Sequence, residues 1–132
     1  MKCAGLVAIQ HQGKVLLLLR SDTPGMPFGG LYGFPGGLIR HGEYIKEGAS
    51  REVQEETGIL VGSRDMEDWV DTSIEYPKEG HVFVYAYRCM VEEAPKITLS
   101  PEHVGYLWVD PKNPQDIPMG PMTRDLLGRL KE

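Results

Sequence analysis

Three glutamates, Glu52, Glu55 and Glu56, are close together in a segment with helical spacing. A helix turns by about 100° per residue, so these carboxylates are expected to project within one arc of its surface. Like charges at this spacing repel one another, and we expect Arg51 to point about a quarter turn away from them. Carboxylate oxygens bind hard divalent cations such as Mg²⁺ and Mn²⁺. The spacing therefore indicates either a metal site or an ordinary solvated acidic face.

The segment in front of this helix favours the metal site. It consists of Gly33-Phe34-Pro35-Gly36-Gly37, and its glycines leave backbone atoms uncovered. A carbonyl or amide group of such a loop can approach a cation or a phosphate closely. We therefore expect the loop and the acidic face of the helix to meet at one point.

These residues also carry a family resemblance. Gly37, Glu43 and the run Arg51-Glu52-Val53-Gln54-Glu55-Glu56-Thr57-Gly58-Ile59 resemble the signature of the Nudix hydrolases and satisfy each position that it specifies. The resemblance implies an α/β/α sandwich around a mixed β-sheet. It also implies hydrolysis of a pyrophosphate bond in a nucleoside diphosphate linked to a group X, such as a (deoxy)nucleoside triphosphate or a dinucleoside polyphosphate.

The resemblance further implies a ligand set for Mg²⁺ or Mn²⁺, namely Glu52, Glu55, Glu56 and the carbonyl of Gly36. A divalent ion neutralises phosphate oxygens and activates water, which lowers both barriers to hydrolysis. By the same resemblance, Arg51 would orient a neighbouring glutamate and Glu43 would tie the loop to the helix.

Two carboxylates are candidates for the general base. Glu52 would act through its proximity to water on the metal, and Glu102 resembles the loop acid of related enzymes, with an exposed loop carboxylate as the alternative. His103, next to Glu102, is a candidate phosphate contact or a plain surface histidine.

Substrate contacts are expected from a few further side chains. Arg20, at the end of a predicted strand, would reach a phosphate or remain an ordinary surface arginine. Five aromatic rings are candidates to stack on a base if they face the cleft rather than the core: Phe28, Tyr32, Tyr76, Tyr85 and Tyr87. Of these, Phe28 and Tyr76 are assigned to the substrate site.

The elements that must position these residues follow from hydrophobic periodicity. Strands are predicted at Gly5–Ile9, Val15–Arg20, Trp69–Ile74, Val82–Val91 and Val104–Val109, and helices at Tyr44–Thr57 and Met122–Leu130. The run Leu16–Leu19 is apolar on both faces, which predicts helices on both sides of the sheet. Ser21–Gly37 is predicted to be a structured loop, and Gly48 to weaken the helix that contains it.

Composition sets the outer bounds of the function. A length of 132 residues predicts one domain, and a net charge of −5 disfavours binding of duplex nucleic acid. Cys3 and Cys89 suggest reduced thiols in a cytoplasmic protein, and neither a membrane span nor a secretory signal is expected, so the mature chain would begin at Met1. The alternatives to a hydrolase acting on nucleotides are a non-hydrolytic nucleotide-sensing module and an RNA 5′-end pyrophosphohydrolase.

Overall fold

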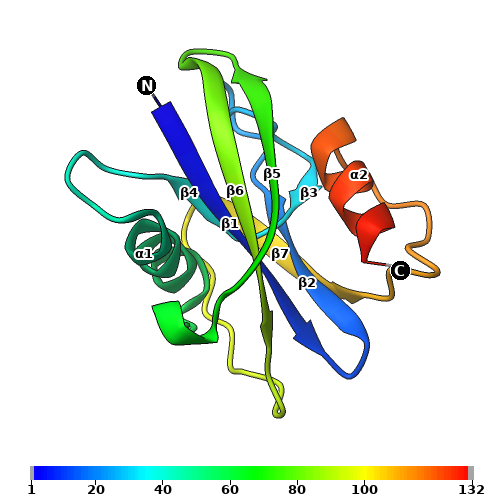
Figure 1. The fold of residues 1–132 in the computed structure, drawn as a ribbon. Helices are drawn as coiled ribbons and strands as arrows, with labels where there is room; N and C mark the ends of the chain where they lie inside the picture. Colours follow the sequence, from blue (N-terminus) through cyan, green and yellow to red (C-terminus); the bar gives the residue numbers. More distant parts are fainter. Residues whose placement is uncertain (1, 131–132) are drawn as a thin grey trace.

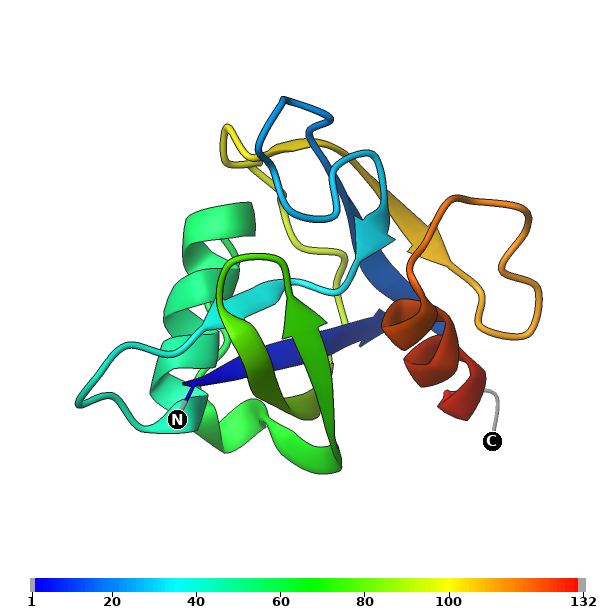
Figure 2. The same cartoon turned by 90° about the horizontal axis from the view of Figure 1, so that it is seen from above.

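The computed structural model describes residues 2–130 and confirms the sandwich around a mixed sheet (Figure 1). The sheet consists of β1 (Lys2–His11), β2 (Lys14–Arg20), β3 (Tyr32–Gly33), β4 (Gly36–Leu38), β5 (Glu67–Tyr76), β6 (Gly80–Met90) and β7 (His103–Val109). The helices are α1 (Ile45–Thr57) and α2 (Pro121–Arg129), and η1 (Ser63–Asp65) is a 3-10 turn. Figure 2 shows α1 and α2 on opposite sides of the sheet.

Both faces of the sheet are covered, as the apolar run in β2 predicted. Alternating side chains of β1 and β2 enter two separate cores. The core on the α1 side contains Val7, Ile9, Leu16, Leu18, Ala49 and Val53. The core on the α2 side contains Leu6, Ala8, Val15, Leu17, Leu126 and Leu127.

The sheet divides where β1 and β2 separate. These two strands pair only next to their turn, at Gln10↔Val15 and His11↔Lys14. Further along, β1 pairs with β4 on one side and in parallel with β6 on the other, whereas β2 pairs with β3 and β7. The segment that connects β3 to β4 therefore crosses from one branch of the sheet to the other.

The helix α1 begins and ends close to the predicted residues. The side chain of Glu47 accepts a hydrogen bond from the amide of Tyr44 at 3.1 Å, and the helix ends at Gly58 in the left-handed conformation with φ of 77°. These contacts satisfy backbone groups at both ends. An N-terminal contact thus exists although Tyr44 is not a usual capping residue.

Gly48 has a packing role that helix propensity did not reveal. A Cβ atom at this position would lie 2.6 Å from Cδ1 of Ile39 and 2.9 Å from Oε1 of Glu43. The missing side chain lets the helix approach the loop that carries these residues. Gly48 therefore has a role in packing in addition to its low helix propensity.

The predicted loop Ser21–Gly37 contains two short strands, β3 and β4, near its end. The five predicted strands are confirmed as β1, β2, β5, β6 and β7, and each extends beyond its predicted residues at one or both ends. Cys3 and Cys89 are free thiols on adjacent strands. Neither helix within residues 2–130 is long and apolar enough to span a bilayer.

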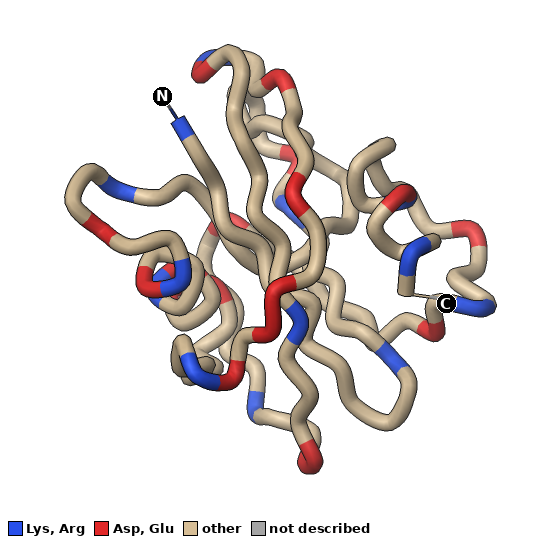
Figure 3. Tube along the Cα trace, in the orientation of Figure 1, with Lys and Arg blue, Asp and Glu red and all other residues tan. Residues whose placement is uncertain are grey.

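Figure 3 shows how charge is distributed over the chain. Acidic residues follow the outer strand β5, whereas lysines and arginines are spread over several separate elements. The basic residues therefore form a dispersed pattern, unlike the continuous stripe that suits a nucleic acid duplex.

Candidate active site

The side chain of Arg51 connects the loop before α1 to the acidic face of the helix. Its Nε donates to Glu43 at 2.8 Å, and its Nη1 donates to Glu52 at 2.9 Å and to Glu55 at 2.8 Å. Nη2 reaches the carbonyl of Leu38 at 3.2 Å. The expected quarter-turn separation is therefore wrong for the guanidinium group, because the long side chain bends back over the acids.

This network changes the acidity of Glu43. Hydrogen bonds from Arg51 and from the amide of Arg40 lower the pKa of Glu43 to about 2. The pKa of Arg51 is raised chiefly by its hydrogen bonds to Glu43. The pair is therefore fully charged at neutral pH, and it joins the loop to the helix, as the family resemblance implied for Glu43.

Glu56 is the most deeply buried acid of the three. Its side chain is only 8% exposed, and Oε1 accepts a hydrogen bond from the amide of Gly36 at 2.8 Å. Burial raises the pKa of Glu56 to about 8, the charges of Glu52 and Glu102 add to the rise, and the Gly36 amide opposes it. A cation close to this carboxylate would offset its cost of burial.

Glu52 lies one turn before Glu56 and faces the same glycine loop. A Cβ atom on Gly37 would lie 2.6 Å from Oε2 of Glu52, so the carboxylate occupies space that any other residue at position 37 would fill. Burial raises the pKa of Glu52, against the opposing effect of Arg51. The loop and the helix thus meet at one point, as expected.

The two carboxylates open into one cavity, together with Glu102 from the loop before β7 and Glu79 from the turn between β5 and β6. The side chains and backbone around it come from Arg20, Pro27, Phe28, Gly36, Gly37, Leu38, Glu52, Glu56, Tyr76, Lys78, Glu79 and Glu102. We call this the acidic cavity. Glu55 lies outside its lining, with a half-exposed side chain bound to Arg51.

The acidic cavity suits a divalent cation in its donor chemistry, although it is not a closed cage. Glu52 and Glu56 offer hard oxygen ligands beside a loop that lacks side chains. Among residues 2–130, however, no group of three acidic, histidine or cysteine side chains is already gathered closely enough to hold an ion. The structure therefore brings two of the three predicted glutamates together, and water or substrate oxygens would complete the coordination.

Hydrogen bonds hold the loop of Glu102 against the end of α1. The amide of Ser100 donates to the carbonyl of Glu56 at 3.1 Å, and the amide of Thr98 donates to the carbonyl of Thr57 at 2.8 Å. Glu102 itself is largely exposed, with Oε2 at 3.6 Å from Nη2 of Arg20. The two candidate bases, Glu52 and Glu102, thus line the same cavity.

His103 lies behind the acidic cavity rather than in its lining. Its side chain is 4% exposed, with Nδ1 hydrogen-bonded to the hydroxyl of Ser100 at 3.2 Å and Nε2 at 4.0 Å from Oε2 of Glu56. Burial lowers the pKa of His103 to about 4, and Arg20 adds to the shift. The ring is therefore neutral at physiological pH.

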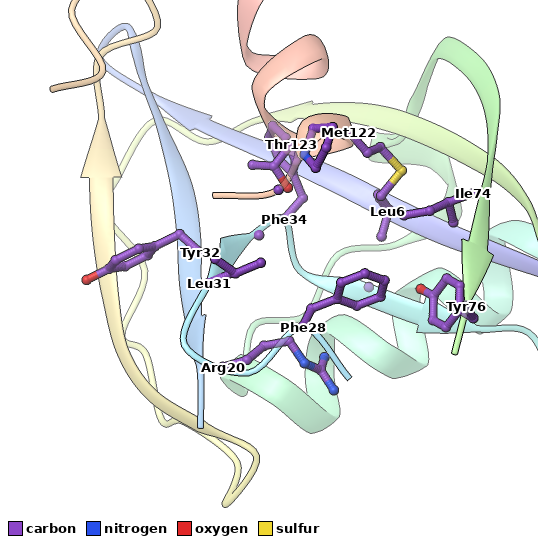
Figure 4. A pocket seen from close by; sticks show the side chains of 14 residues that line it. Leu6, Arg20, Phe28, Leu31, Tyr32, Phe34, Ile74, Tyr76, Met122 and Thr123 are labelled. Carbon is purple, nitrogen blue, oxygen red and sulfur yellow. The ribbon is translucent and has the colours of Figure 1, made fainter. Parts of the chain in front are cut away.

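A second cavity adjoins the first and lies between the sheet and α2 (Figure 4). Arg20, Phe28, Gly36 and Tyr76 line both cavities. The rings of Phe28 and Tyr76 meet edge to face at 5.4 Å, and Phe28 holds a positive φ of 59°. We call this the apolar cavity, because most of its walls are hydrophobic side chains.

The other candidate rings divide between two faces of the sheet. Tyr32 lines the apolar cavity, whereas Tyr85 and Tyr87 pack with the core on the α1 side. The period of two along β6 explains this, because Tyr85 and Tyr87 alternate with residues that face α2. Arg20, at the wall between the cavities, donates from Nε to the carbonyl of Pro27 at 2.9 Å.

Two segments that line these cavities were not predicted from the sequence. Lys78 reaches the acidic cavity from the turn between β5 and β6. Residues 120–123, at the start of α2, line the apolar cavity. The two strands and the helix were predicted from the sequence, but the side on which each meets the site depends on pairing between distant strands.

Residues 1–128 match the NUDIX domain family. The ADP-ribose pyrophosphatase of Methanocaldococcus jannaschii is 34% identical over 74 residues, which span 56% of this chain but only 41% of that protein. Nucleoside triphosphatase NudI of Escherichia coli is 28% identical over 130 residues, with 93% of this chain and 91% of the relative covered. The solved MutT protein from Methanosarcina mazei Go1 is 28% identical, with a TM-score of 0.79, and the match covers 98% of this chain and 91% of that one.

Proposed function

Because the chain belongs to the Nudix hydrolase family, we propose that it hydrolyses a pyrophosphate bond in a nucleoside diphosphate linked to X, with Mg²⁺ or Mn²⁺ as cofactor. The observation that carries this proposal is the pairing of Glu52 and Glu56 with the bare Gly36–Gly37 loop in one cavity. The names of the relatives support nucleotides as the substrate class.

Glu52 and Glu56 would hold the cation, and Glu55, released from part of its contact with Arg51, would join them. When bound, the ion would supply positive charge against phosphate oxygens and make water more acidic. Arg51 would keep Glu52 in place through Oε1 and leave Oε2 toward the cavity. The Gly36 amide would hold Glu56 in the same way. The carbonyl of Gly36 would be the further ligand that the family resemblance implies.

The remaining residues of the acidic cavity would bind the substrate and move a proton. Arg20 and Lys78 would bind phosphate oxygens, because they are the cationic side chains in the lining. Glu52 or Glu102 would take the proton from the attacking water. Phe28 and Tyr76 would contact the base where the two cavities meet. His103 would act on phosphate only indirectly, through Glu56.

We also propose that this reaction takes place in the cytoplasm, and the free thiols of Cys3 and Cys89 support this location.

The test is a hydrolysis screen with product identification, in the presence and absence of Mg²⁺ or Mn²⁺. The panel contains nucleoside triphosphates, ADP-ribose, nucleotide sugars, dinucleoside polyphosphates and a 5′-triphosphorylated RNA. We expect metal-dependent turnover of at least one nucleotide, reduced about 10²-fold or more in Glu52→Gln, Glu55→Gln and Glu56→Gln. Glu67→Gln, an exposed position on β5, is the control for loss of one charge.

Two results would replace this proposal with another function. Nucleotide binding without release of any phosphate, in wild type and with both metals, would indicate a sensing module. Turnover confined to the RNA, with binding that weakens steeply as salt increases, would indicate an RNA 5′-end hydrolase.

A further inference from the structure

Strand β7 has a single neighbour in the sheet. It pairs with β2 along its length, and no other strand within residues 2–130 pairs with its outer side. Figure 2 shows β7 at the outer margin of this branch of the sheet, beyond β2. Backbone groups on the unpaired side of an edge strand can form hydrogen bonds to another chain.

The backbone groups of Tyr106 and Trp108 turn toward this outer side. Their direction follows from Arg20 on β2, whose amide donates to the carbonyl of Leu31 at 3.1 Å and whose carbonyl accepts from Gly30 at 3.0 Å, both on the β3 side. Direction alternates along a strand, so the odd-numbered residues of β2 bond to β7, where their partners are also odd-numbered. The even-numbered residues of β7 therefore turn away from β2, and no other backbone group of the described chain bonds to Tyr106 or Trp108.

The outer edge of β7 is regular only over residues 105–109. The pairing with β2 shifts register between Gly105 and His103, so that Val104 is an extra residue in a bulge, and the strand ends at Val109. Regular pairing to a further strand is not expected beyond a bulge. Leu107 therefore lies at the middle of the usable edge.

This edge is apolar and carries no charge. Tyr106 and Leu107 are 44% and 38% exposed, and the sequence of β7 contains no aspartate, glutamate, lysine or arginine. Soluble proteins commonly protect a free edge with charged side chains or proline. The sequence of β7 provides neither, which indicates that a partner covers the edge.

Charge distinguishes this edge from the other long edge of the sheet. Within the described chain β5 pairs with β6 alone, and its acidic residues are Glu67, Asp68, Asp71 and Glu75. Two copies placed side by side along β5 would bring like charges together, whereas two copies along β7 would not. Charge therefore directs self-association to β7.

We propose that β7 pairs antiparallel with β7 of a second copy of this chain, around a two-fold axis at Leu107. In this register Tyr106 of each copy lies opposite Trp108 of the other, and a pair of this kind exchanges two backbone hydrogen bonds. All outward amides and carbonyls of residues 105–109 then have partners in both copies. Leu107 meets its own counterpart at a position without hydrogen bonds, where side chains of neighbouring strands approach most closely.

The symmetry of this register favours a second copy over an unrelated strand. It sets one aromatic side chain against another, leucine against leucine, and leaves no outward backbone group of the regular edge unpaired. Stable interfaces bury about 1,200–2,000 Å² in total, and a ladder of about five residues covers less, so we expect reversible dimers with a Kd on the order of 100 μM. The proposal does not depend on the proposed function, because hydrolysis needs only one chain.

Concentration dependence tests the dimer in the wild-type protein. Sedimentation equilibrium should show the average mass rising from that of one chain at about 10 μM toward twice that mass at about 1 mM. Amide hydrogen exchange of Tyr106 and Trp108 should slow about fourfold over this range, because the monomer fraction falls by that factor. The amide of Leu107 is the internal control, since it faces β2 in both states.

A charge pair at the two-fold axis tests the register. Leu107→Lys and Leu107→Glu should each raise the Kd about tenfold or more, because like charges would meet at the axis. An equimolar mixture of the two variants should form dimers again, since opposite charges would then meet. Ser73→Lys, at an exposed position on β5, is the control for an added charge and should leave the Kd within about twofold. Thermal melting would verify that each variant is folded.

Three results would overturn the proposal. The first is a wild-type protein that keeps the mass of one chain up to about 1 mM. The second is a dimer in which the exchange of Tyr106 and Trp108 does not change with concentration, because the copies would then meet through another surface. The third is a mixture of the folded Leu107 variants that remains monomeric. The exchange measurement decides the matter even if a variant fails to fold.

Discussion

Arg51 illustrates how a single residue organises this site. Its guanidinium group binds Glu43 on the loop and both Glu52 and Glu55 on the helix. Each of these acids would repel its neighbours without that positive charge. Because Arg51 takes only one oxygen of Glu52, the other oxygen stays next to Gly37.

The contact between Arg51 and Glu43 predicts a specific dependence of stability on pH. We expect Glu43→Gln to lower the free energy of unfolding at pH 7 by about 1.5–3 kcal/mol, as for a hydrogen-bonded charged pair. The pKa of Glu43 is lowered to about 2, so its stabilising effect is complete above the ordinary value of 4.5 and is lost as pH falls toward 2.

Urea titrations of wild type and variant between pH 7 and pH 2 would measure this. The difference should shrink below pH 4.5 and disappear near pH 2. A difference that stays constant over that range would show that the charge of Glu43 is not its cause. Glu67→Gln serves as the exposed control, with an expected change of about 0.5 kcal/mol or less.

At the scale of elements, the close approach of α1 to the loop before it predicts an unusual response to alanine. Gly48→Ala should lower the free energy of unfolding by about 1–3 kcal/mol, because the new methyl group would overlap Ile39 and Glu43. Gly128→Ala in α2 is the matched control. A Cβ there has no neighbour within 4 Å, so this variant should gain about 0.5–1 kcal/mol from helix propensity.

Denaturant unfolding of both glycine variants would give the comparison. If Gly48→Ala were as stabilising as Gly128→Ala, the loop would be free to move away from the helix. The fixed geometry that we describe between Glu43, Arg51 and α1 would then be incorrect.

Hydrophobic periodicity in the sequence predicted some of these elements and missed others. Periodicity was sufficient for α1, α2 and the longer strands, because each has an apolar face of its own. It missed β3 and β4, which are two and three residues long and exist through pairing with β2 and β1. The sequence also suggested His103 as a candidate phosphate contact. Its side chain is instead buried behind Glu56, and this burial depends on how the loop before β7 folds onto α1.

The molecule as a whole is negatively charged, and it would therefore repel a polyanionic substrate. The chain carries a net charge of −5, and the acidic cavity itself contains four glutamates against the two basic residues Arg20 and Lys78: Glu52, Glu56, Glu79 and Glu102. Binding of a nucleotide therefore depends on a cation and on these two basic residues. Lys78 is exposed, so its contribution should be sensitive to salt.

We predict that Lys78→Gln raises KM for a nucleoside triphosphate about fivefold at low ionic strength, with kcat unchanged. The effect should nearly vanish at about 1 M salt, where charges are screened within about 3 Å. Lys14→Gln, on an exposed position at the far end of β1 and β2, should leave KM unaltered. Steady-state kinetics at two salt concentrations would decide, and equal KM values for the two variants would remove Lys78 from the substrate site.

The parallel pairing of β1 with β6 has a consequence for how the protein is made. Leu6 lies opposite Ala86, so the ribosome must synthesise most of the chain before the middle of the sheet can close. The acidic residues of α1 emerge well before β6 does. A nascent chain therefore displays its glutamates before it has the scaffold that aligns them, and the site forms only after β6 and the loop of Glu102 have been synthesised.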